Sequence, residues 1–292
     1  MGEEIGEGAF RECTSLKQVK LPEGVTEIGT NAFEGCTGLR RVIIPGSVNK
    51  IGHYAFWKCT GLKRVLIPPS VTEIGYYTFC DCTGLTELII PGAVTEICPH
   101  AFEGCTGLKS VTIPEGVNEI GSCAFGWCTG LVKVTIPGSV KKIGMGAFEE
   151  CTGLEKVTIP GSVEEICSSA FNGCTGLTEV RILMGVNKIG QGAFRGCTGL
   201  TEVSIPGSVE KIGKDAFRGC TGLKRVILPK SLMIPGLRQS RLTIRSLKDI
   251  PGMGESLLVF ILGCQEWGIP REIIFIIIET LVNTNYKLLV AY

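Results

Sequence analysis

The sequence predicts an α/β repeat solenoid, a superhelix of about ten 23-residue coils, because three residue types recur at one period. Phenylalanine recurs every 23 residues over the range Phe10–Phe217, and cysteine and leucine keep the same spacing over Cys13–Cys220 and Leu16–Leu223. A fixed period of roughly 20–50 residues indicates stacked repeats, each of which contacts only its neighbours. A single coil of this length cannot bury its own apolar side chains, so we expect the coils to share one continuous core.

Each unit carries the pattern of one short strand. The unit at 25–47 reads VTEIGTNAFEGCTGLRRVIIPGS, in which Leu39-x-x-Val42-x-Ile44 has the spacing L-x-x-L-x-L. Side chains alternate along a strand, so Val42 and Ile44 are predicted to face the core. Arg41 and Ile43 then face outward, on a parallel sheet that we expect to line the concave side of the solenoid.

Proline ends this predicted strand, because it has no amide hydrogen for the sheet. Pro45 has an equivalent in every unit except the eighth, where Leu183 stands in its place. Val25 and Ile28 are predicted to flank a second short extended segment on the opposite side of the coil.

The segment between these two extended pieces has the spacing of a helical face. Ala32, Phe33, Cys36 and Leu39 lie at i, i+1, i+4 and i+7, which predicts a short helical turn on the convex side with Phe33 pointing inward. Gly38 is predicted to take a positive φ angle, which would let the chain leave the helix and enter the strand.

The repeat unit I-G-x-x-A-F-x-x-C-x-x-L-x-x-V-x-I-P resembles the BspA-type leucine-rich repeat over about residues 1–232. The resemblance implies a leucine-rich-repeat superhelix without the usual asparagine ladder. It also implies a surface or interaction protein of the kind found in bacteria and unicellular eukaryotes, and it identifies no ligand.

The repeats end near residue 232, so the sequence predicts a solenoid at 1–232 and an irregular segment at 233–292. Pro270 and Glu272 suit the first turn of a helix predicted at 270–282. We interpret this helix as a cap on the last coil. A second interpretation is an F-box-like adaptor helix that recruits ubiquitin machinery, because P-x-E-I-I is similar to the start of that motif.

Composition favours a protein partner over nucleic acid or membrane. Lys plus Arg is 29 and Asp plus Glu is 28, so the chain lacks the basic excess that neutralises phosphates. No apolar run reaches the ~18–20 residues needed to span a bilayer, and Met1–Gly6 does not resemble a signal peptide. The pattern specifies no oligomeric state.

The cysteines favour a reducing, cytoplasmic location. The recurring cysteine is expected to be a small buried side chain with a free thiol. The alternative is a cell-surface or secreted adhesin, cut from a longer repeat array, in which cysteines would be paired. A zinc site is a weaker interpretation of Cys80, Cys98, Cys123 and His100, because these residues occupy different positions of the repeat and no C-x-x-C brackets them.

No catalytic motif accompanies the repeats. The two histidines, His53 and His100, have no serine or aspartate at a triad-like spacing, and no phosphate loop or zinc-protease motif is present. We therefore expect a non-enzymatic protein with no cofactor and no metal.

Two surface patches are predicted to bind a partner. On the strand face, three consecutive units place an apolar residue at the outward position and charged residues beside it, namely Ile43, Leu66 and Ile89 with Arg41, Arg64 and Glu87. An apolar strip with a charged rim is typical of protein contacts, although β-branched residues also favour strands for their own sake. A weaker patch on the convex turns comprises Tyr54, Trp57, Tyr76 and Tyr77.

The predicted function is a protein–protein interaction scaffold that binds its partner through the concave sheet. The adhesin and the F-box-like adaptor are the alternatives, together with a purely structural array that has no specific ligand.

Overall fold

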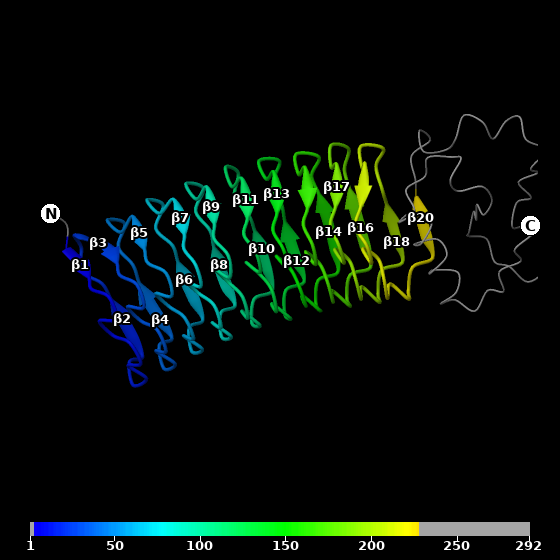
Figure 1. Cartoon of the computed structure of the whole chain (residues 1–292). Coiled ribbons are helices and arrows are strands. Elements are labelled where there is room, and N and C mark those ends of the chain that lie inside the picture. Colours follow the sequence, from blue (N-terminus) through cyan, green and yellow to red (C-terminus); the bar gives the residue numbers. More distant parts are fainter. Residues whose placement is uncertain (1–2, 228–292) are drawn as a thin grey trace, which may run out of the picture.

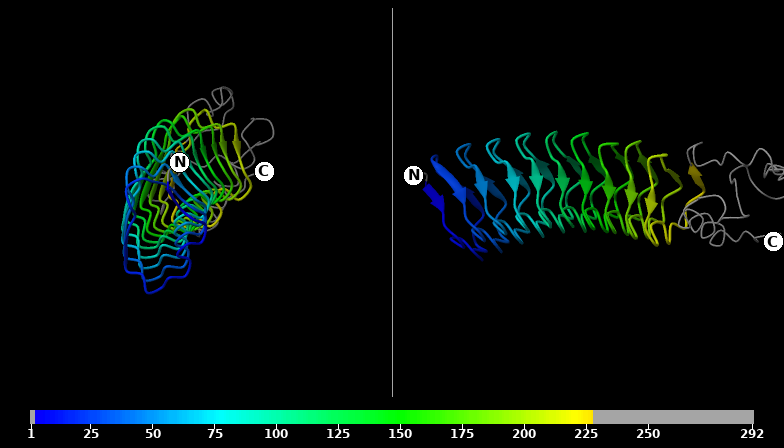
Figure 2. Two further views of the ribbon diagram at one scale, coloured as in Figure 1. Left: turned by 90° about the vertical axis from the view of Figure 1, so that its left-hand side faces the viewer. Right: turned by 45° about the horizontal axis from the view of Figure 1, so that its top comes forward.

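The computed structural model describes residues 3–227, which form an elongated, gently curved rod of stacked coils (Figures 1 and 2). We number the coils 1–10 by the phenylalanine that each contains, from Phe10 to Phe217. Each coil contributes one short strand to each of two rows that run along the rod (Figure 1).

The main strand row contains the L-x-x-V-x-I segments, β2 (Gln18–Lys20), β4 (Arg41–Ile43), β6 (Arg64–Leu66), β8 (Glu87–Ile89), β10 (Ser110–Thr112), β12 (Lys133–Thr135), β14 (Lys156–Ile159), β16 (Glu179–Ile182), β18 (Glu202–Ser204) and β20 (Arg225–Ile227). The second strand row contains β1 (Glu3–Ile5), β3 (Val25–Ile28), β5 (Lys50–Ile51), β7 (Glu73–Ile74), β9 (Glu96–Ile97), β11 (Glu119–Ile120), β13 (Lys142–Ile143), β15 (Glu165–Ile166), β17 (Lys188–Ile189) and β19 (Lys211–Ile212). Both rows appear where the sequence predicts extended segments.

Strands of neighbouring coils pair in parallel and in register with the repeat. Val111 lies opposite Val134 in the main row, and Ile120 lies opposite Ile143 in the second row. The hydrogen-bonded ladders are interrupted once in each row, between β8 and β10 and between β5 and β7. The interruptions fall between different coils, so every pair of neighbouring coils keeps at least one ladder.

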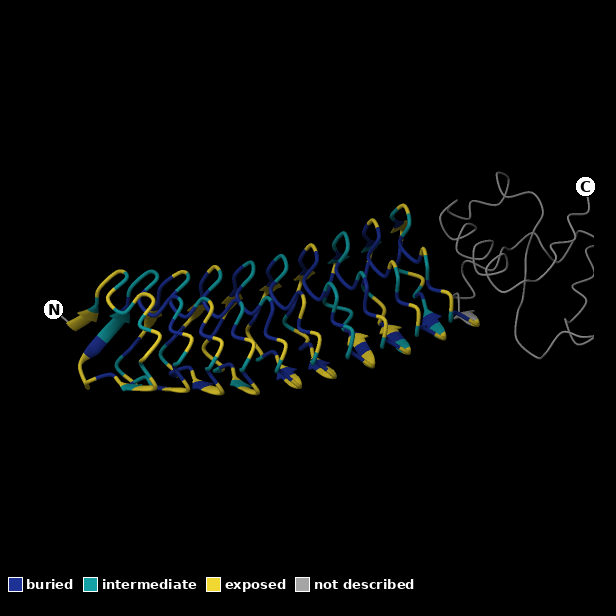
Figure 3. Cartoon of the chain, turned by 90° about the horizontal axis from the view of Figure 1, so that it is seen from below, coloured by how far each residue is buried: buried dark blue, intermediate teal, exposed yellow. Residues whose placement is uncertain are grey.

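Buried residues recur in every coil along the rod (Figure 3), and their side chains form one continuous core. The phenylalanine rings stack face to face from Phe10 to Phe217, with centroids 5.0–5.5 Å apart. Phe56 and Cys59 are completely buried. The prediction that equivalent residues form rows along the solenoid is therefore confirmed.

The predicted helical turns are wrong, since the described residues contain strands and turns but no helix. In a helix the amide of Phe33 would bond within its own segment, whereas here it donates to the carbonyl of Ala55 in the next coil at 2.8 Å. The amides of Asn31 and Gly35 likewise bond forward, to His53 and Trp57. Hydrogen bonds from residue i to residue i−3 alternate with these inter-coil bonds along the turn. The conformation of the turn therefore depends on hydrogen bonds to the next coil.

The predicted role of Gly38 is also wrong. The positive φ angles of this turn lie six and ten positions before Arg41, the first residue of β4, at Gly35 (68°) and Asn31 (56°), and Gly38 is not among them. The reason for glycine in the Gly38 column is close backbone approach. A Cβ on its equivalent Gly61 would lie 2.5 Å from the carbonyl oxygen of Thr37 in the preceding coil.

Replacement of proline by Leu183 has a visible effect on the main row. The amide of Leu183 donates to the carbonyl of Ile159 at 3.0 Å, a bond that proline cannot make. Pairing of β14 with β16 accordingly extends to Ile159 and Ile182. The predicted boundary at residue 232, the segment 233–292 and its helix at 270–282 lie outside the described residues.

Candidate functional site

The strand face of coils 2–4 carries a row of aliphatic side chains. Leu66 and Ile89 are direct partners across β6 and β8, and their side chains are 51% and 58% exposed. Ile43 occupies the same position on β4 and is half-buried. The strands hold these side chains outward because Val65 and its equivalents take the core side of each strand.

The charged residues predicted to rim this row lie beside it on the same strands. Arg41 lies opposite Arg64, and the Arg64 Nε is 3.2 Å from a carboxylate oxygen of Glu87. Both members of this ion pair are exposed to solvent, so the pair adds little to the stability of the fold. We call Arg41, Ile43, Arg64, Leu66, Glu87 and Ile89 the strand-face patch.

The patch ends where the ladder of the main row is interrupted. Beyond β8 the outward position holds Thr112, Thr135 and Thr158, all exposed. A small polar residue is the ordinary occupant of a solvated strand face. Coils 2–4 therefore differ from coils 5–7 at this position by large apolar side chains.

On the turn side the structure brings together three of the four aromatic residues predicted to form a convex patch. The rings of Tyr54 and Tyr77 stack at 4.8 Å, and Trp57 meets Tyr54 edge-on at 5.7 Å. Tyr76 instead contacts His53, with a ring distance of 5.1 Å. The rings of three of the predicted residues therefore contact one another, while Tyr76 adjoins them through its carbonyl, which accepts the Tyr54 amide at 2.9 Å.

His100 extends this stack and was not predicted as part of it. Its ring lies 4.4 Å from that of Tyr77 and nearly parallel to it. The signal was present in the sequence, because 54, 77 and 100 are 23 residues apart. All three residues have φ angles of 55–60°, a region that costs bulky residues about 1 kcal/mol or more and is usually left to glycine or asparagine.

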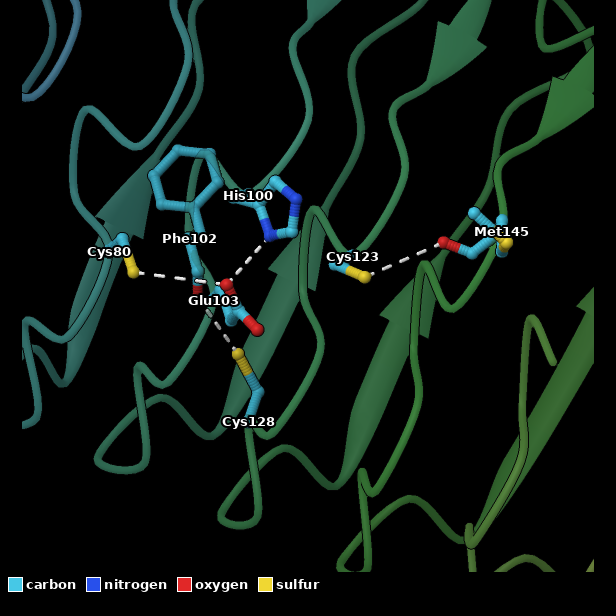
Figure 4. Close-up of polar contacts among 7 residues, drawn as sticks. All are labelled: Cys80, His100, Phe102, Glu103, Cys123, Cys128 and Met145. Carbon is cyan, nitrogen blue, oxygen red and sulfur yellow. Dashed lines mark hydrogen bonds and ion pairs between the residues drawn. The ribbon is translucent and has the colours of Figure 1, made fainter.

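Figure 4 shows a small polar cluster around His100 and Glu103. Glu103 receives a contact of 2.7 Å from the Nδ1 of His100, and the Sγ of Cys80 lies 4.0 Å from the same carboxylate oxygen. Burial raises the pKa of the Cys80 thiol to about 12, and the charges of Asp81 and Glu103 act in the same direction. A catalytic cysteine needs a lowered pKa, so this cluster does not activate a nucleophile.

The residues considered for zinc do not converge. The Sγ of Cys98 lies 3.4 Å from Glu73 on the second strand row, and that of Cys123 contacts the carbonyl of Met145 (Figure 4). Within residues 3–227 no group of three or more His, Cys, Asp or Glu side chains could hold a metal ion.

The recurring cysteines have a regular hydrogen-bonding role. From Cys36 onward, each thiol donates to the carbonyl of the phenylalanine 26 residues earlier, as Cys105 does to Phe79 at 3.2 Å. The cysteines of this column from Cys36 to Cys197 are free thiols. Burial raises the pKa of the Cys82, Cys105 and Cys151 thiols well above the ordinary value.

A parallel β-solenoid with 23-residue coils and an L-x-x-V-x-I strand in every coil defines a leucine-rich repeat protein. The family described as BspA type leucine rich repeat region matches residues 3–109 and 95–224. The chain belongs to this family. A comparison with curated proteins gives no match, and no helix among the described residues is long and apolar enough to cross a membrane.

Several solved bacterial structures are similar to the chain. A leucine-rich repeat protein from Bacteroides ovatus is 29% identical, with 74% of this chain and 82% of that one covered and a TM-score of 0.45. A leucine rich cell surface protein from Faecalibacterium prausnitzii is 29% identical, with 77% and 83% covered and a TM-score of 0.43. A leucine-rich repeat protein from Eubacterium ventriosum is 24% identical, with 78% and 70% covered and a TM-score of 0.50.

Proposed function

We propose that this chain is a non-enzymatic scaffold that binds a protein partner through its strand-face patch. The observation that carries the proposal is the exposed pair Leu66 and Ile89, held side by side on a rigid parallel sheet. Exposed aliphatic side chains rimmed by charge are the usual centre and edge of a protein interface. The threonines at the same position in coils 5–7 show that the repeat itself does not require an apolar residue there.

Leu66→Asp tests the proposal. Removing the burial of one leucine in an interface costs about 1.5–3 kcal/mol, which corresponds to a loss of roughly tenfold or more in affinity. Thr135→Asp is the matched control, because it introduces the same charge at the same position two coils outside the patch. Since both side chains face solvent, we expect both variants to keep the circular dichroism spectrum and the melting temperature of the parent.

The measurement is affinity isolation from an extract of the source cells or of cells that they contact, followed by titration of the purified partner. Support would be a protein retained by the parent and by Thr135→Asp but lost by Leu66→Asp. If every retained protein binds the two variants equally, the patch is not the binding surface. Unfolding of Leu66→Asp alone would place Leu66 in the core and contradict the strand register.

The turn-side aromatic residues are a second candidate surface, which the geometry favours less. The faces of Tyr77 are covered by Tyr54 and His100, and the ammonium group of Lys58 lies 4.3 Å from the centroid of the Trp57 ring. Both faces of the Tyr77 ring and one face of the Trp57 ring are therefore already in contact with neighbouring side chains. The F-box-like adaptor depends on residues outside the described part and stays a prediction.

The cell-surface adhesin is the alternative that differs in location. The redox state of the cysteines, measured on protein taken from its natural source, distinguishes the scaffold from the adhesin. Free thiols on titration under native and denaturing conditions favour a reducing compartment, whereas paired cysteines would favour the adhesin.

A further inference from the structure

The strand face of coils 1–3 carries a concentration of positive charge that adjoins the strand-face patch. Six basic side chains lie on or directly before the first three strands of the main row, and all are exposed, namely Lys17, Lys20, Arg40, Arg41, Lys63 and Arg64. We call these six residues the basic block. Two of them, Arg41 and Arg64, also belong to the strand-face patch.

The protein does not neutralise this charge itself. Arg41 lies opposite Arg64, so like charges face each other across two strands, which is unfavourable. Among the described residues, Arg64 is the only member of the basic block that forms an ion pair, with Glu87. In the second strand row of coils 1–3 the one lysine, Lys50, is paired, because Glu27 of the preceding coil bridges to it at 2.6 Å.

Like charges alone do not distinguish the basic block, but their surroundings do. Lys133 also lies opposite Lys156 in the main row, and Lys156 bridges to Glu179 at 3.0 Å just as Arg64 bridges to Glu87. The outward position in those coils holds threonine. Among the side chains that the structure describes, coils 2–4 alone place a large aliphatic residue at this outward position, and the basic block lies on the same face of coils 1–3.

The opposite side of the same half of the rod is acidic. The second strand row of coils 1–6 presents six glutamates, five of them exposed and Glu27 half-buried, and a single lysine, Lys50; the glutamates are Glu3, Glu4, Glu27, Glu73, Glu96 and Glu119. Within coils 1–6 the two strand rows therefore carry net charges of opposite sign. Such a separation orients a charged partner toward one face during encounter.

We propose that the basic block and the adjoining aliphatic row bind an acidic polypeptide segment that carries apolar side chains between its carboxylates. This inference rests on the proposed function and adds the chemistry of the partner. Carboxylates would pair with the lysine and arginine side chains, and the apolar side chains would cover Leu66 and Ile89. A polypeptide fits better than a nucleic acid because this face presents aliphatic side chains and no exposed aromatic ring on which a base could stack.

The test uses the full chain and a fluorescent 12-residue peptide of alternating glutamate and leucine, followed by anisotropy at low and high salt. A Glu–Ser peptide and a Lys–Leu peptide of the same length are the controls for apolar contact and for charge. The triple variant Lys17→Glu, Arg40→Glu, Lys63→Glu should bind the Glu–Leu peptide at least about tenfold more weakly at low salt. The matched variant Lys109→Glu, Lys133→Glu, Lys156→Glu makes the same change of charge on coils 5–7 and should bind like the parent.

Further outcomes distinguish this inference from the proposed function. If Leu66→Asp abolishes binding of the natural partner but neither the Glu–Leu peptide nor charge reversal in the basic block has any effect, the acidic partner is wrong and the scaffold function stands. If charge reversal weakens binding and Leu66→Asp does not, the aliphatic row is not part of the site and this proposal fails.

Two other occupants would also overturn the inference. Binding of a 12-nucleotide oligouridylate that exceeds binding of the Glu–Leu peptide would identify a nucleic-acid surface. Concentration-dependent dimerisation in sedimentation experiments, abolished by the basic-block variant and by reversal of Glu73, Glu96 and Glu119, would identify a second copy of the chain. Circular dichroism and the melting temperature verify that each variant is folded.

Discussion

At the scale of single residues, the column of buried cysteines links stability to pH. Burial raises the pKa of the Cys128 thiol from an ordinary value of 9.0 to about 12. In the folded protein the thiol stays protonated at pH values where the unfolded chain would lose the proton. Its contribution to stability is therefore complete below about pH 9 and is lost as the pH rises toward 12.

We expect the free energy of unfolding to fall between pH 9 and pH 11 by up to about 1.4 kcal/mol per pH unit for each such thiol. Cys128→Ala should lower stability at neutral pH by about 1–3 kcal/mol, because it leaves a small cavity and removes the hydrogen bond to Phe102. The substitution should also remove the contribution of one thiol to the fall in the free energy of unfolding between pH 9 and pH 11. Urea unfolding under reducing conditions measures both, and an unchanged slope would contradict protonation of Cys128 in the fold.

The positions of glycine show where residue-level prediction from sequence fails. The spacing of Gly38 in the repeat marks a backbone constraint, but it does not distinguish a positive φ angle from close approach of a neighbouring coil. The turn instead places Tyr54 and Tyr77 in the left-handed region. A sequence offers little reason to expect a tyrosine there, because the stacking that accompanies it depends on the neighbouring coil.

At the scale of elements, strands were predictable and turns were not. Alternation between core and solvent identifies a strand from its own residues, as it does for Val42 and Ile43. The spacing of Ala32, Phe33 and Cys36 equally fits one helical turn and a loop whose amides bond to the next coil. The loop forms because each neighbour offers a carbonyl at the right distance, and single-coil reasoning does not include this contact.

The phenylalanine stack predicts how the cost of truncation varies along the rod. Phe125 is fully buried between Phe102 and Phe148, whereas Phe10 is half-buried and, among the described residues, stacks on Phe33 alone. We expect Phe125→Ala to cost about 3–5 kcal/mol and Phe10→Ala about half as much or less. Urea unfolding of the two variants measures the difference, and equal losses would contradict the idea that the cost of truncation follows the number of stacked ring neighbours.

At the scale of the whole molecule, the aliphatic row was predictable because alternation alone exposes Leu66 and Ile89. The basic block was missed because a total charge averages over surfaces. The excess of positive charge on the main strand row of coils 1–3 appears only when the columns are laid side by side, since the second row carries the compensating glutamates. The distribution of charge over the surface therefore says more about the chemistry of the partner than the net charge of the chain does.

The same view identifies the boundary between coils 3 and 4 as one place where the rod should open locally. The amide of Gly52 donates to Ile28 at 2.7 Å and that of Gly121 to Ile97 at 2.9 Å, but within residues 3–227 Gly75 makes no equivalent bond to Ile51. The amide of Tyr76 bonds to the Nδ1 of His53 instead. Because a solenoid is stabilised mainly by contacts between neighbouring coils, a boundary with fewer such bonds opens at lower free energy.

Hydrogen–deuterium exchange should therefore be faster in peptides that cover 71–77 than in those that cover 117–123, the same positions two coils later. His53→Ala removes the substitute acceptor and should increase exchange at 71–77 further while leaving 117–123 unchanged. The continuous ring contact between Phe56 and Phe79, at 5.3 Å, should keep this opening local, so the variant should still unfold in one transition. Uniform exchange in both segments would mean that core packing, and not the strand ladders, sets the local stability of the rod.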